Sequence, residues 1–350
     1  MQLRYSSLSV LFILAVLFSV SGTTCLHAAT WQTTNFTVSA HDPKIAQKMA
    51  VRAEELRKNM AELWLGESLP NWYKRAEIKI RIGQLAPGGE TSFIFSDGEV
   101  YGWIMDIQGT EERVYDSVLP HEITHMILAS HFRRPVPRWA DEGAATFTES
   151  IAERRKYQKM LIDFLTGQKG IPMDRLFGLQ DYPKDKEYIL PLYAQGYSVS
   201  EFLIRQRGPK YFTYFIQKSM ERETGWNELI YECYGYETLQ ELQNDWVTWV
   251  GEGSPEFLGS NLIAGDQMNN GTAPGETVSP TGVILASAVI PADNSSRDNQ
   301  VRPAVSVQPR SVPATYQGQN LAAVRDPAVV RKPYSDAEPI RWQSSGIHPE

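Results

Sequence analysis

The sequence predicts an α+β protein in which a small N-terminal mixed sheet is followed by helices and then by a disordered tail. Segments that alternate apolar and polar residues, as strands do, come first. Segments whose apolar residues recur every three or four positions, as in helices, come afterwards, so the pattern favours α+β over a parallel α/β sheet. Of the 21 prolines in the 350 residues, 11 lie after Gly253, whereas eight of the nine tryptophans lie before it. The folded part is therefore expected to span residues 30–253.

The first residues have the features of an export signal. Arg4 precedes an apolar stretch at residues 8–20, which is too short to cross a bilayer and is typical of a secretory signal. Residues 1–29 are therefore expected to be a signal peptide, cleaved between positions 22 and 29, that sends the protein to the periplasm, the cell surface or the medium. An uncleaved anchor is the alternative. A lipid anchor at Cys25 is disfavoured because no Leu stands in the three positions before it.

Composition excludes several classes of protein. The formal net charge is −7 and no basic run is present, which argues against a nucleic-acid partner. No apolar run reaches 18 residues, so a multi-spanning membrane protein is excluded and no stable membrane insertion is expected once the signal is removed. A monomer is expected. Without Cys25 the chain keeps Cys233 alone, which is expected to be a buried core thiol.

The elements expected before residue 110 are strands at 36–40, 77–82, 93–95 and 100–107 and a helix at 43–65. Asp42 is suited to cap the first turn of that helix. The turn Ser96-Asp97-Gly98 between the last two strands is typical of a β-hairpin.

From residue 111 the apolar period changes from two to 3.6, which predicts helices. A loop with prolines at 132–137 separates the first two of them. The helices expected are 111–131, 138–165, 193–207, 210–221 and 238–250.

The residues with the clearest chemistry are His121 and His125, which stand with Glu122 in an H-E-x-x-H pattern. Residues four apart on a helix differ by about 40° in direction and about 6 Å in height, so both imidazoles can reach one metal ion. Glu122 points about 100° away from His121, where a general base belongs. The alternative is a helix with two solvated histidines. It is disfavoured because only four histidines lie between the signal and the tail, and two of them are here.

A zinc ion needs a third protein ligand, and the sequence offers His131, Glu142 and Asp141. On a continuous helix His131 faces about 120° away from His125 and lies about 9 Å further along. Reaching the ion would require a sharp turn near Leu128, where no Gly is present. His131 is therefore expected to be a residue at the C-terminal end of the helix.

Glu142 is the favoured third ligand. The loop at 132–137 can span about 20 Å, enough to bring the next helix back beside the first. Glu142 shares a face of that helix with Trp139, Gly143 and Thr146, and Gly143 would let the two helices approach closely near the metal. Asp141 points about 100° away and is expected to be a charge at the helix N-terminus. His121, His125 and Glu142 would thus hold the metal and leave a fourth position for water.

Three stretches carry a resemblance to a known family: LPHEITH (119–125), PRWADEGAA (137–145) and YAQGY (193–197). They resemble the gluzincin zinc metallopeptidases, which are thermolysin-like, and in particular the bacterial peptidase MA-like group. The resemblance implies a zincin-like catalytic domain in residues 30–253 that holds one Zn²⁺ through His121, His125 and Glu142, with Glu122 as the catalytic base. One position departs from the pattern, because Thr146 stands where such enzymes often have an Asp that orients a ligand histidine. Asp116, Thr146 or Glu149 would then orient it.

The resemblance implies peptide hydrolysis, with a peptide or protein as substrate. Glu122 would take a proton from water and return it to the leaving amine. Tyr193, or less favourably Tyr197, would stabilise the oxyanion. The substrate would pair with an edge strand at 100–107. The alternatives are a zinc hydrolase for esters or other amides, and an exported binding or adhesion protein with a zincin fold.

The region at 254–350 is rich in Pro, Ser, Asn, Gln and Ala and is expected to be disordered. An apolar island at 281–290 is the exception and would suit a strand or a docking peptide. The tail would serve as a linker to a surface, as a propeptide-like inhibitor, or in no particular role, and the first is preferred. Its deletion is expected to leave hydrolysis intact.

Overall fold

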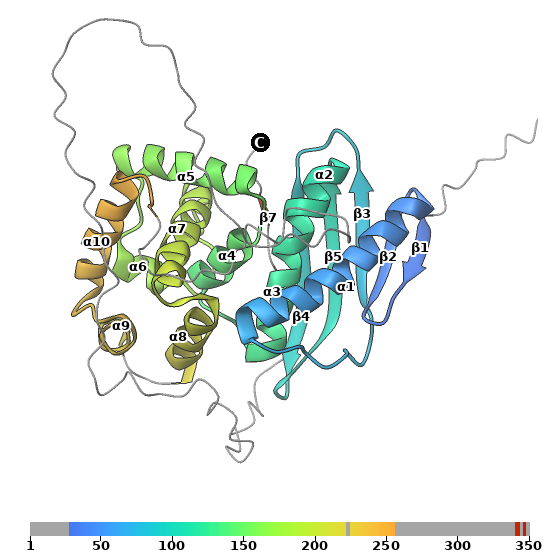
Figure 1. Ribbon diagram of the computed structural model, residues 1–350, viewed down its shortest axis with the longest axis horizontal. Coiled ribbons are helices and arrows are strands. Elements are labelled where there is room, and N and C mark those ends of the chain that lie inside the picture. Colours follow the sequence, from blue (N-terminus) through green and yellow to red (C-terminus); the bar gives the residue numbers. More distant parts are fainter. Residues whose placement is uncertain (1–27, 222–224, 256–339, 344–345, 348–350) are drawn as a thin grey trace, which may run out of the picture.

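The computed structural model describes residues 28–221, 225–255, 340–343 and 346–347 (Figure 1). Residues 1–27 of the expected signal peptide and the apolar island at 281–290 lie outside the described residues, whereas Ala29 is the first residue of a strand. Figure 1 shows a sheet with its helices on one side of the molecule and a group of helices on the other.

One mixed sheet contains every strand of the described residues. Its N-terminal strands are β1 (Ala29–Gln32), β2 (Phe36–Ala40), β3 (Ala76–Ile82), β4 (Gly88–Ser96) and β5 (Glu99–Gly109), and two more are β6 (Ile340–Gln343) and β7 (Gly346–Ile347). The order is β1-β2-β3-β5-β4-β6, and β7 also pairs with β4. β3 runs parallel to β2 and to β5, whereas the other pairs are antiparallel. The predicted small mixed sheet is thus confirmed.

Local sequence signals explain the N-terminal elements. Asp97 and Gly98 both have positive φ, as the hairpin turn between β4 and β5 requires. Helix α1 (Pro43–Leu65) begins after Asp42, whose side chain accepts a hydrogen bond from the Lys44 backbone N–H, and it ends at Gly66 in the left-handed region. The predicted cap and hairpin are therefore confirmed.

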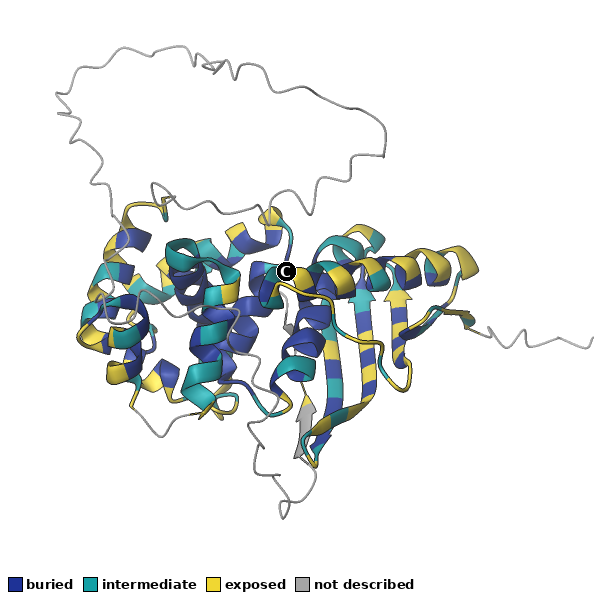
Figure 2. Ribbon diagram, turned by 60° about the horizontal axis from the view of Figure 1, so that its bottom comes forward, coloured by how far each residue is buried: buried dark blue, intermediate teal, exposed yellow. Residues whose placement is uncertain are grey.

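The predicted helix at 111–131 is continuous but not uniform. It consists of α2 (Glu111–Arg113), a π-helical turn η1 (Val114–Val118) and α3 (Leu119–Phe132), and it ends at Arg133 in the left-handed region. Helix α3 lies against β4 and β5, α1 lies against β1 and β2, and the two helices also contact each other. They therefore cover the same face of the sheet, with a buried layer between helices and strands (Figure 2).

The remaining helices form the other side of the molecule. They are α4 (Arg138–Phe147), α5 (Ile151–Thr166), α6 (Met173–Phe177), the 3₁₀ turn η2 (Lys186–Tyr188), α7 (Ile189–Arg207), α8 (Pro209–Glu221), α9 (Trp226–Tyr234) and α10 (Leu239–Gly251). Helices α7, α8 and α10 match the prediction, whereas α6 and α9 were not predicted. The predicted single helix at 138–165 is wrong. It is interrupted because Ser150 starts a new helix by accepting a hydrogen bond from the Glu153 backbone N–H.

Helix α4 crosses α7 at two glycines. A Cβ on Gly143 would lie 2.1 Å from Ser200 Oγ and 2.4 Å from the Gly196 carbonyl oxygen, and one on Gly196 would lie 2.8 Å from the Trp139 carbonyl oxygen. The sequence predicted that Gly143 allows close approach of the two metal-site helices, α3 and α4. That prediction is wrong, because the close approach is to α7.

The strands next to the hairpin also correct two expectations. The strand at 100–107 was predicted to lie at an edge, but β5 lies between β3 and β4 because its other side pairs in parallel with β3. β4 lies at the end of the N-terminal sheet opposite to β1, and its outer side pairs with β6 and β7. The expected disorder after residue 253 therefore does not extend to these two strands, whereas residues 256–339 lie outside the described part.

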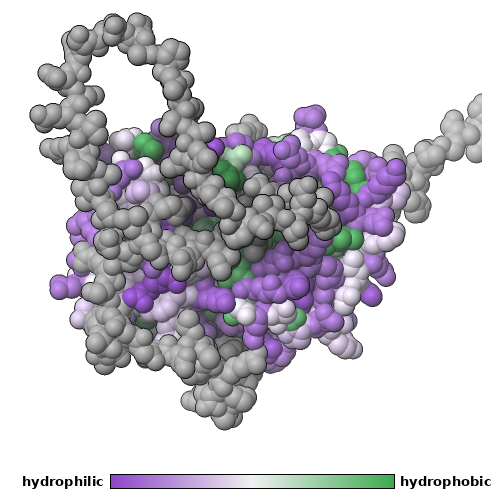
Figure 3. All heavy atoms as spheres, viewed as in Figure 1, coloured by the Kyte–Doolittle hydropathy of each residue, from purple (hydrophilic) through white to green (hydrophobic). Residues whose placement is uncertain are grey.

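No helix in the described part of the chain is long and apolar enough to cross a membrane. On the face seen in Figure 3, hydrophilic residues dominate the described surface and apolar ones are scattered. Cys233 is buried and unpaired by any disulfide, as predicted.

Candidate metal centre

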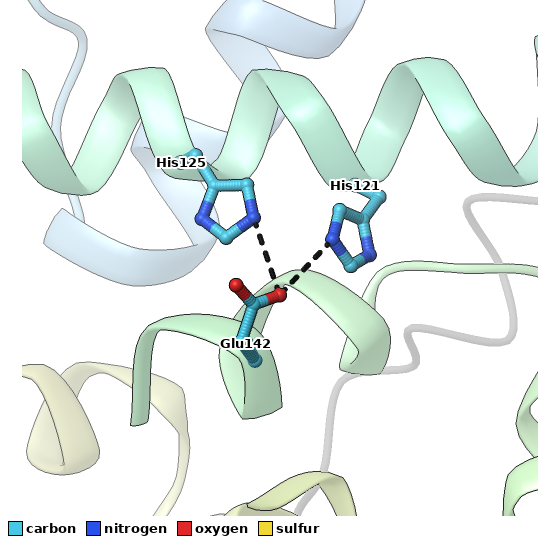
Figure 4. Close-up of side chains that lie close together, drawn as sticks. All are labelled: His121, His125 and Glu142. Carbon is cyan, nitrogen blue, oxygen red and sulfur yellow. Dashed lines mark ion pairs between the residues drawn. The ribbon is translucent and has the colours of Figure 1, made fainter. Parts of the chain in front are cut away.

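Helix α3 presents two imidazoles to the helices beyond it. His121 and His125 both point from α3 toward α4 (Figure 4), and both side chains are buried. Their spacing of four residues brings them to the same side of the helix, with ring centroids 4.9 Å apart. The alternative of two solvated histidines is excluded.

Glu142 faces them from the first half of α4. Its Oε2 lies 3.5 Å from Nε2 of His121 and 3.6 Å from Nε2 of His125. One ligand atom from each of these residues lies within 4.8 Å of the other two, and all three residues are buried. Pro137 precedes the helix, as predicted, and starts the turn that carries Glu142 to this position.

The triangle fits a tetrahedral metal ion. With bonds of about 2.0–2.1 Å to zinc, neighbouring tetrahedral ligand atoms lie about 3.4 Å apart. The two nitrogen-to-oxygen separations are close to that value and longer than hydrogen bonds. Two imidazoles and one carboxylate are also the donor set of catalytic zinc sites. The residues present therefore fit a zinc ion.

Each histidine is oriented by a carboxylate on its other ring nitrogen. Nδ1 of His121 lies 2.8 Å from Oε1 of Glu149, and Nδ1 of His125 lies 2.9 Å from Oδ1 of Asp141. Such pairs fix the ring orientation and leave Nε2 available to a metal. Among the orienting residues considered from the sequence, Glu149 takes this position, because the break between α4 and α5 turns it toward α3.

Asp141 has a role that the sequence analysis missed. It was weighed as a ligand and otherwise as a charge at the helix N-terminus, but its carboxylate binds the far nitrogen of His125. The available signal in the sequence was that Asp141 stands directly before Glu142, the expected ligand.

Glu142 is held through its second oxygen. Oε1 accepts a short hydrogen bond from the Tyr182 hydroxyl and lies 3.7 Å from Nη1 of Arg138. The Arg138 guanidinium also lies over the Tyr182 ring, 4.4 Å from its centroid. Oε2 is therefore directed to the histidines. Tyr182 was missed because it lies between α6 and η2, where no periodic pattern indicates which way a side chain points.

Tyr193 lies beside the same group. Its ring stacks on that of His121 at 6.5 Å, and its hydroxyl is 3.3 Å from the Tyr182 hydroxyl. Burial, and then the charge of Glu142, hold the pKa of Tyr193 well above its ordinary value, so the hydroxyl keeps its proton. For Tyr197, the less favoured alternative, burial and then the charge of Glu201 raise the pKa well above its ordinary value.

Glu122 is fully buried and lies against strand β4. A Cβ on Gly89 would come 2.4 Å from Oε1 of Glu122, so only a glycine leaves room for this carboxylate beside the strand. The candidate base is thus enclosed between α3 and the backbone of β4.

The charged groups of the site shift the pKa values of one another. Burial alone would lower the pKa of His121, but the nearby carboxylates of Glu142 and Glu149 outweigh it and raise the pKa to about 9. Burial also opposes the positive charge of His125, yet Asp141 and Glu142 hold its pKa well above the ordinary value. The pKa of Glu142 is well below its ordinary value because the two histidines outweigh its burial.

His131 is not brought to this group. It is partly exposed near the end of α3, and its ring packs against Phe132. Within the described part of the chain, the group that could hold a metal ion consists of His121, His125 and Glu142.

The fold and the site define an α+β protein with a buried two-histidine, one-glutamate centre between a sheet-bound helix and a helical half. No protein-family model matches the chain, and no curated protein matches it significantly. Among solved structures it is similar to an M1 zinc metallopeptidase from Deinococcus radiodurans (18% identity, TM-score 0.33), with 63% of this chain and 51% of that chain covered. A mutant of that enzyme, and a two-domain M1 mutant bound to L-arginine, each match at 16% identity and TM-score 0.33. The alignments span about half the length of those chains.

Proposed function

We propose that this protein is a zinc-dependent metallopeptidase of the gluzincin type. The observation that carries the proposal is the convergence of Nε2 of His121, Nε2 of His125 and Oε2 of Glu142 on one point, with a buried glutamate next in sequence to the first histidine. A zinc site with a purely structural role does not need this additional carboxylate, which is not one of the three ligands. The finer assignment to the thermolysin-like, peptidase MA-like group rests on the sequence stretches quoted above.

The residues of the chain divide the work of hydrolysis. A zinc ion held by the three ligands would supply Lewis acidity that polarises the scissile carbonyl and makes water more acidic. Glu122 accepts a proton from the attacking water and then donates it to the nitrogen of the leaving amine. The carboxylate is therefore unprotonated again at the end of each turnover. Asp141 and Glu149 keep both imidazoles oriented, and Arg138 with Tyr182 keeps Glu142 oriented.

Tyr193 is our candidate for stabilising the negative oxygen that forms during attack. Its raised pKa keeps the hydroxyl protonated and able to donate a hydrogen bond. Its hydroxyl now lies beside that of Tyr182, so it would exchange this partner for the substrate.

We also propose that the protein is exported and acts as a monomer outside the cytoplasm. The support is the sequence of residues 1–29, whose short apolar stretch follows a basic residue.

The proposal is tested by replacing Glu122. Glu122→Gln keeps the size of the side chain but cannot accept the proton, so hydrolysis of a mixed peptide library should fall by about 10²–10⁴-fold. Zinc content, measured by atomic emission, should stay at about one ion per chain. Glu112→Gln, an exposed glutamate on α2, is the matched control and should change neither quantity. A wild-type chain that holds zinc and cleaves no peptide in the library would disprove the peptidase assignment.

A further inference from the structure

The outer edge of β4 is the starting observation. A sheet edge presents unpaired backbone N–H and C=O groups and readily pairs with another extended segment. Here that edge is taken by the chain's own residues, because β6 and β7 pair with β4 in antiparallel orientation. The two strands keep one register: Phe95 pairs with Ile340 at one end and Gly88 with Ile347 at the other. The described residues 340–343 and 346–347 therefore pair with both ends of β4.

The segment suits this position in sequence as well. Ile-Arg-Trp-Gln at 340–343 alternates apolar and polar residues, as strands do. No proline occurs between Pro339 and Pro349, and a strand needs its N–H groups for the ladder. Gln343 also donates a short side-chain hydrogen bond to Glu90 on β4.

The same segment passes beside the candidate catalytic centre. Gly346 is the register partner of Gly89, and Gly89 is the residue whose backbone lies against the Glu122 carboxylate. Paired strands lie about 4.8 Å apart, so the main chain at Gly346 lies one strand away from that position. Figure 1 shows β7 at the junction between the sheet and the helical half, where the metal centre is also found.

An extended peptide can bind a sheet edge by adding itself as a strand, with main-chain hydrogen bonds supplying affinity. The N-terminal sheet ends at β1 on one side and at β4 on the other, and the β4 edge is the one beside Glu122. That edge is already in use. In this arrangement Nε2 of both histidines and Oε2 of Glu142 are inaccessible to solvent.

We propose that the segment carrying β6 and β7 is a cis-acting peptide ligand of the β4 edge, which these two strands occupy in place of an extended peptide substrate. The inhibitory part of this inference rests on the proposed function, whereas the docking part does not. Because the ligand belongs to the same chain, its binding is intramolecular and its effect is independent of protein concentration. A substrate must displace the segment before it can pair with β4.

The test uses the full chain with the segment disrupted. The double substitution Arg341→Pro with Trp342→Pro removes two adjacent N–H donors, so at least one ladder hydrogen bond is lost whichever residue faces β4. Val305→Pro with Ser306→Pro makes the same change elsewhere in the C-terminal region and is the matched control. A chain that ends at Pro339 serves as a second disrupted form.

Binding is measured first, with a fluorescent synthetic peptide that has the sequence of residues 338–350. We expect the disrupted chains to bind it at least about tenfold more tightly than the full chain and the control, because their β4 edge is open. Equal binding to all four chains, or binding to none, overturns the inference. This readout does not require hydrolysis.

Hydrolysis of a mixed peptide library is measured next, below saturation. We expect the disrupted chains to cleave at least about fivefold faster than the full chain, through a lower KM, and added synthetic peptide to reverse the gain. The rate per molecule should not change with protein concentration. If the disrupted chains cleave no faster than the control, the inhibitory role is wrong while the peptidase assignment stands. If no form cleaves peptides but the peptide still binds the disrupted chains selectively, the proposed function fails and the docking stands.

Discussion

The two halves of the molecule contribute to the metal centre in different ways. The sheet half supplies His121, Glu122 and His125 from a single helix, so their relative positions follow from helix geometry alone. The helical half supplies Glu142 from α4, and with it the groups that orient the ligands. Its contribution depends on how α4 is placed against α3 and α7. One half therefore carries a local motif, and the other completes it through tertiary packing.

The largest expected effect comes from removing the link between the halves. In Glu142→Ala the two histidines remain but the third ligand is lost, so zinc content after dialysis should fall from about one ion per chain to near zero. Zinc is measured by atomic emission, and circular dichroism serves to check that the fold persists. Retention of zinc and activity in this variant would mean that the helical half does not complete the site.

The next effect concerns the carboxylates that the helical half places behind the histidines. Asp141→Asn and Glu149→Gln each weaken the hold on one imidazole, so zinc affinity should fall by about 10–100-fold in each variant. Competition with a chromophoric chelator measures the affinity. Asp163→Asn, an exposed residue on α5, is the control and should leave it unchanged. An unchanged affinity in both variants would show that the orientation of the histidines is fixed within the sheet half.

A smaller effect is expected from the crossing inside the helical half. Gly143→Ala would force a methyl group against Ser200 and the Gly196 carbonyl, so the free energy of unfolding should fall by about 1–3 kcal/mol. Urea unfolding followed by tryptophan fluorescence measures it. A Cβ on Gly251, at the end of α10, would meet no heavy atom within 4 Å, so Gly251→Ala should not destabilise the protein. Equal unfolding midpoints for the two variants would contradict the close crossing.

The smallest expected effect concerns the reactivity of the buried Cys233 thiol in the helical half. Burial, followed by the charge of Glu232, raises the pKa of the Cys233 thiol to about 12. At pH 8 its thiolate fraction should be on the order of a thousandfold lower than that of an ordinary thiol, and labelling by iodoacetamide correspondingly slow. Mass spectrometry follows the labelling in low urea. Labelling that begins before global unfolding would show that the helical half opens independently, whereas rapid labelling without urea would contradict the burial.

The sheet half was more predictable from the sequence than the helical half. The cap at Asp42, the hairpin turn and strands β2 and β3 are set by neighbouring residues, and the structure has them where the sequence predicted them. β1 was not predicted, and β4 begins at Gly88 rather than at Phe93. The sequence predicted that His121, His125 and Glu142 come together, and they do. Their catalytic and metal-binding roles stay predictions.

What the sequence did not reveal depends on pairing across long separations. β5 lies inside the sheet because β3 pairs with it on one side and β4 on the other. The residues of β5 alone therefore do not indicate its interior position. The pairing of β6 and β7 with β4 and the approach of Tyr182 to Glu142 also depend on residues far apart in the chain. The break at Ser150 is different, because the Ser150 and Glu153 spacing of a capping box was present in the sequence and was overlooked.

The π-helical turn at Val114–Val118 has a consequence for changes in chain length. A π turn holds one residue more than an α-helical turn, so it acts as a one-residue insertion ahead of α3. Because the wide turn absorbs the extra residue, deleting one residue there would let the turn become α-helical and leave the direction of α3 relative to β5 nearly unchanged. His121 and His125 would still face Glu142. One extra residue within a regular α-helical turn would instead rotate everything after it by about 100°.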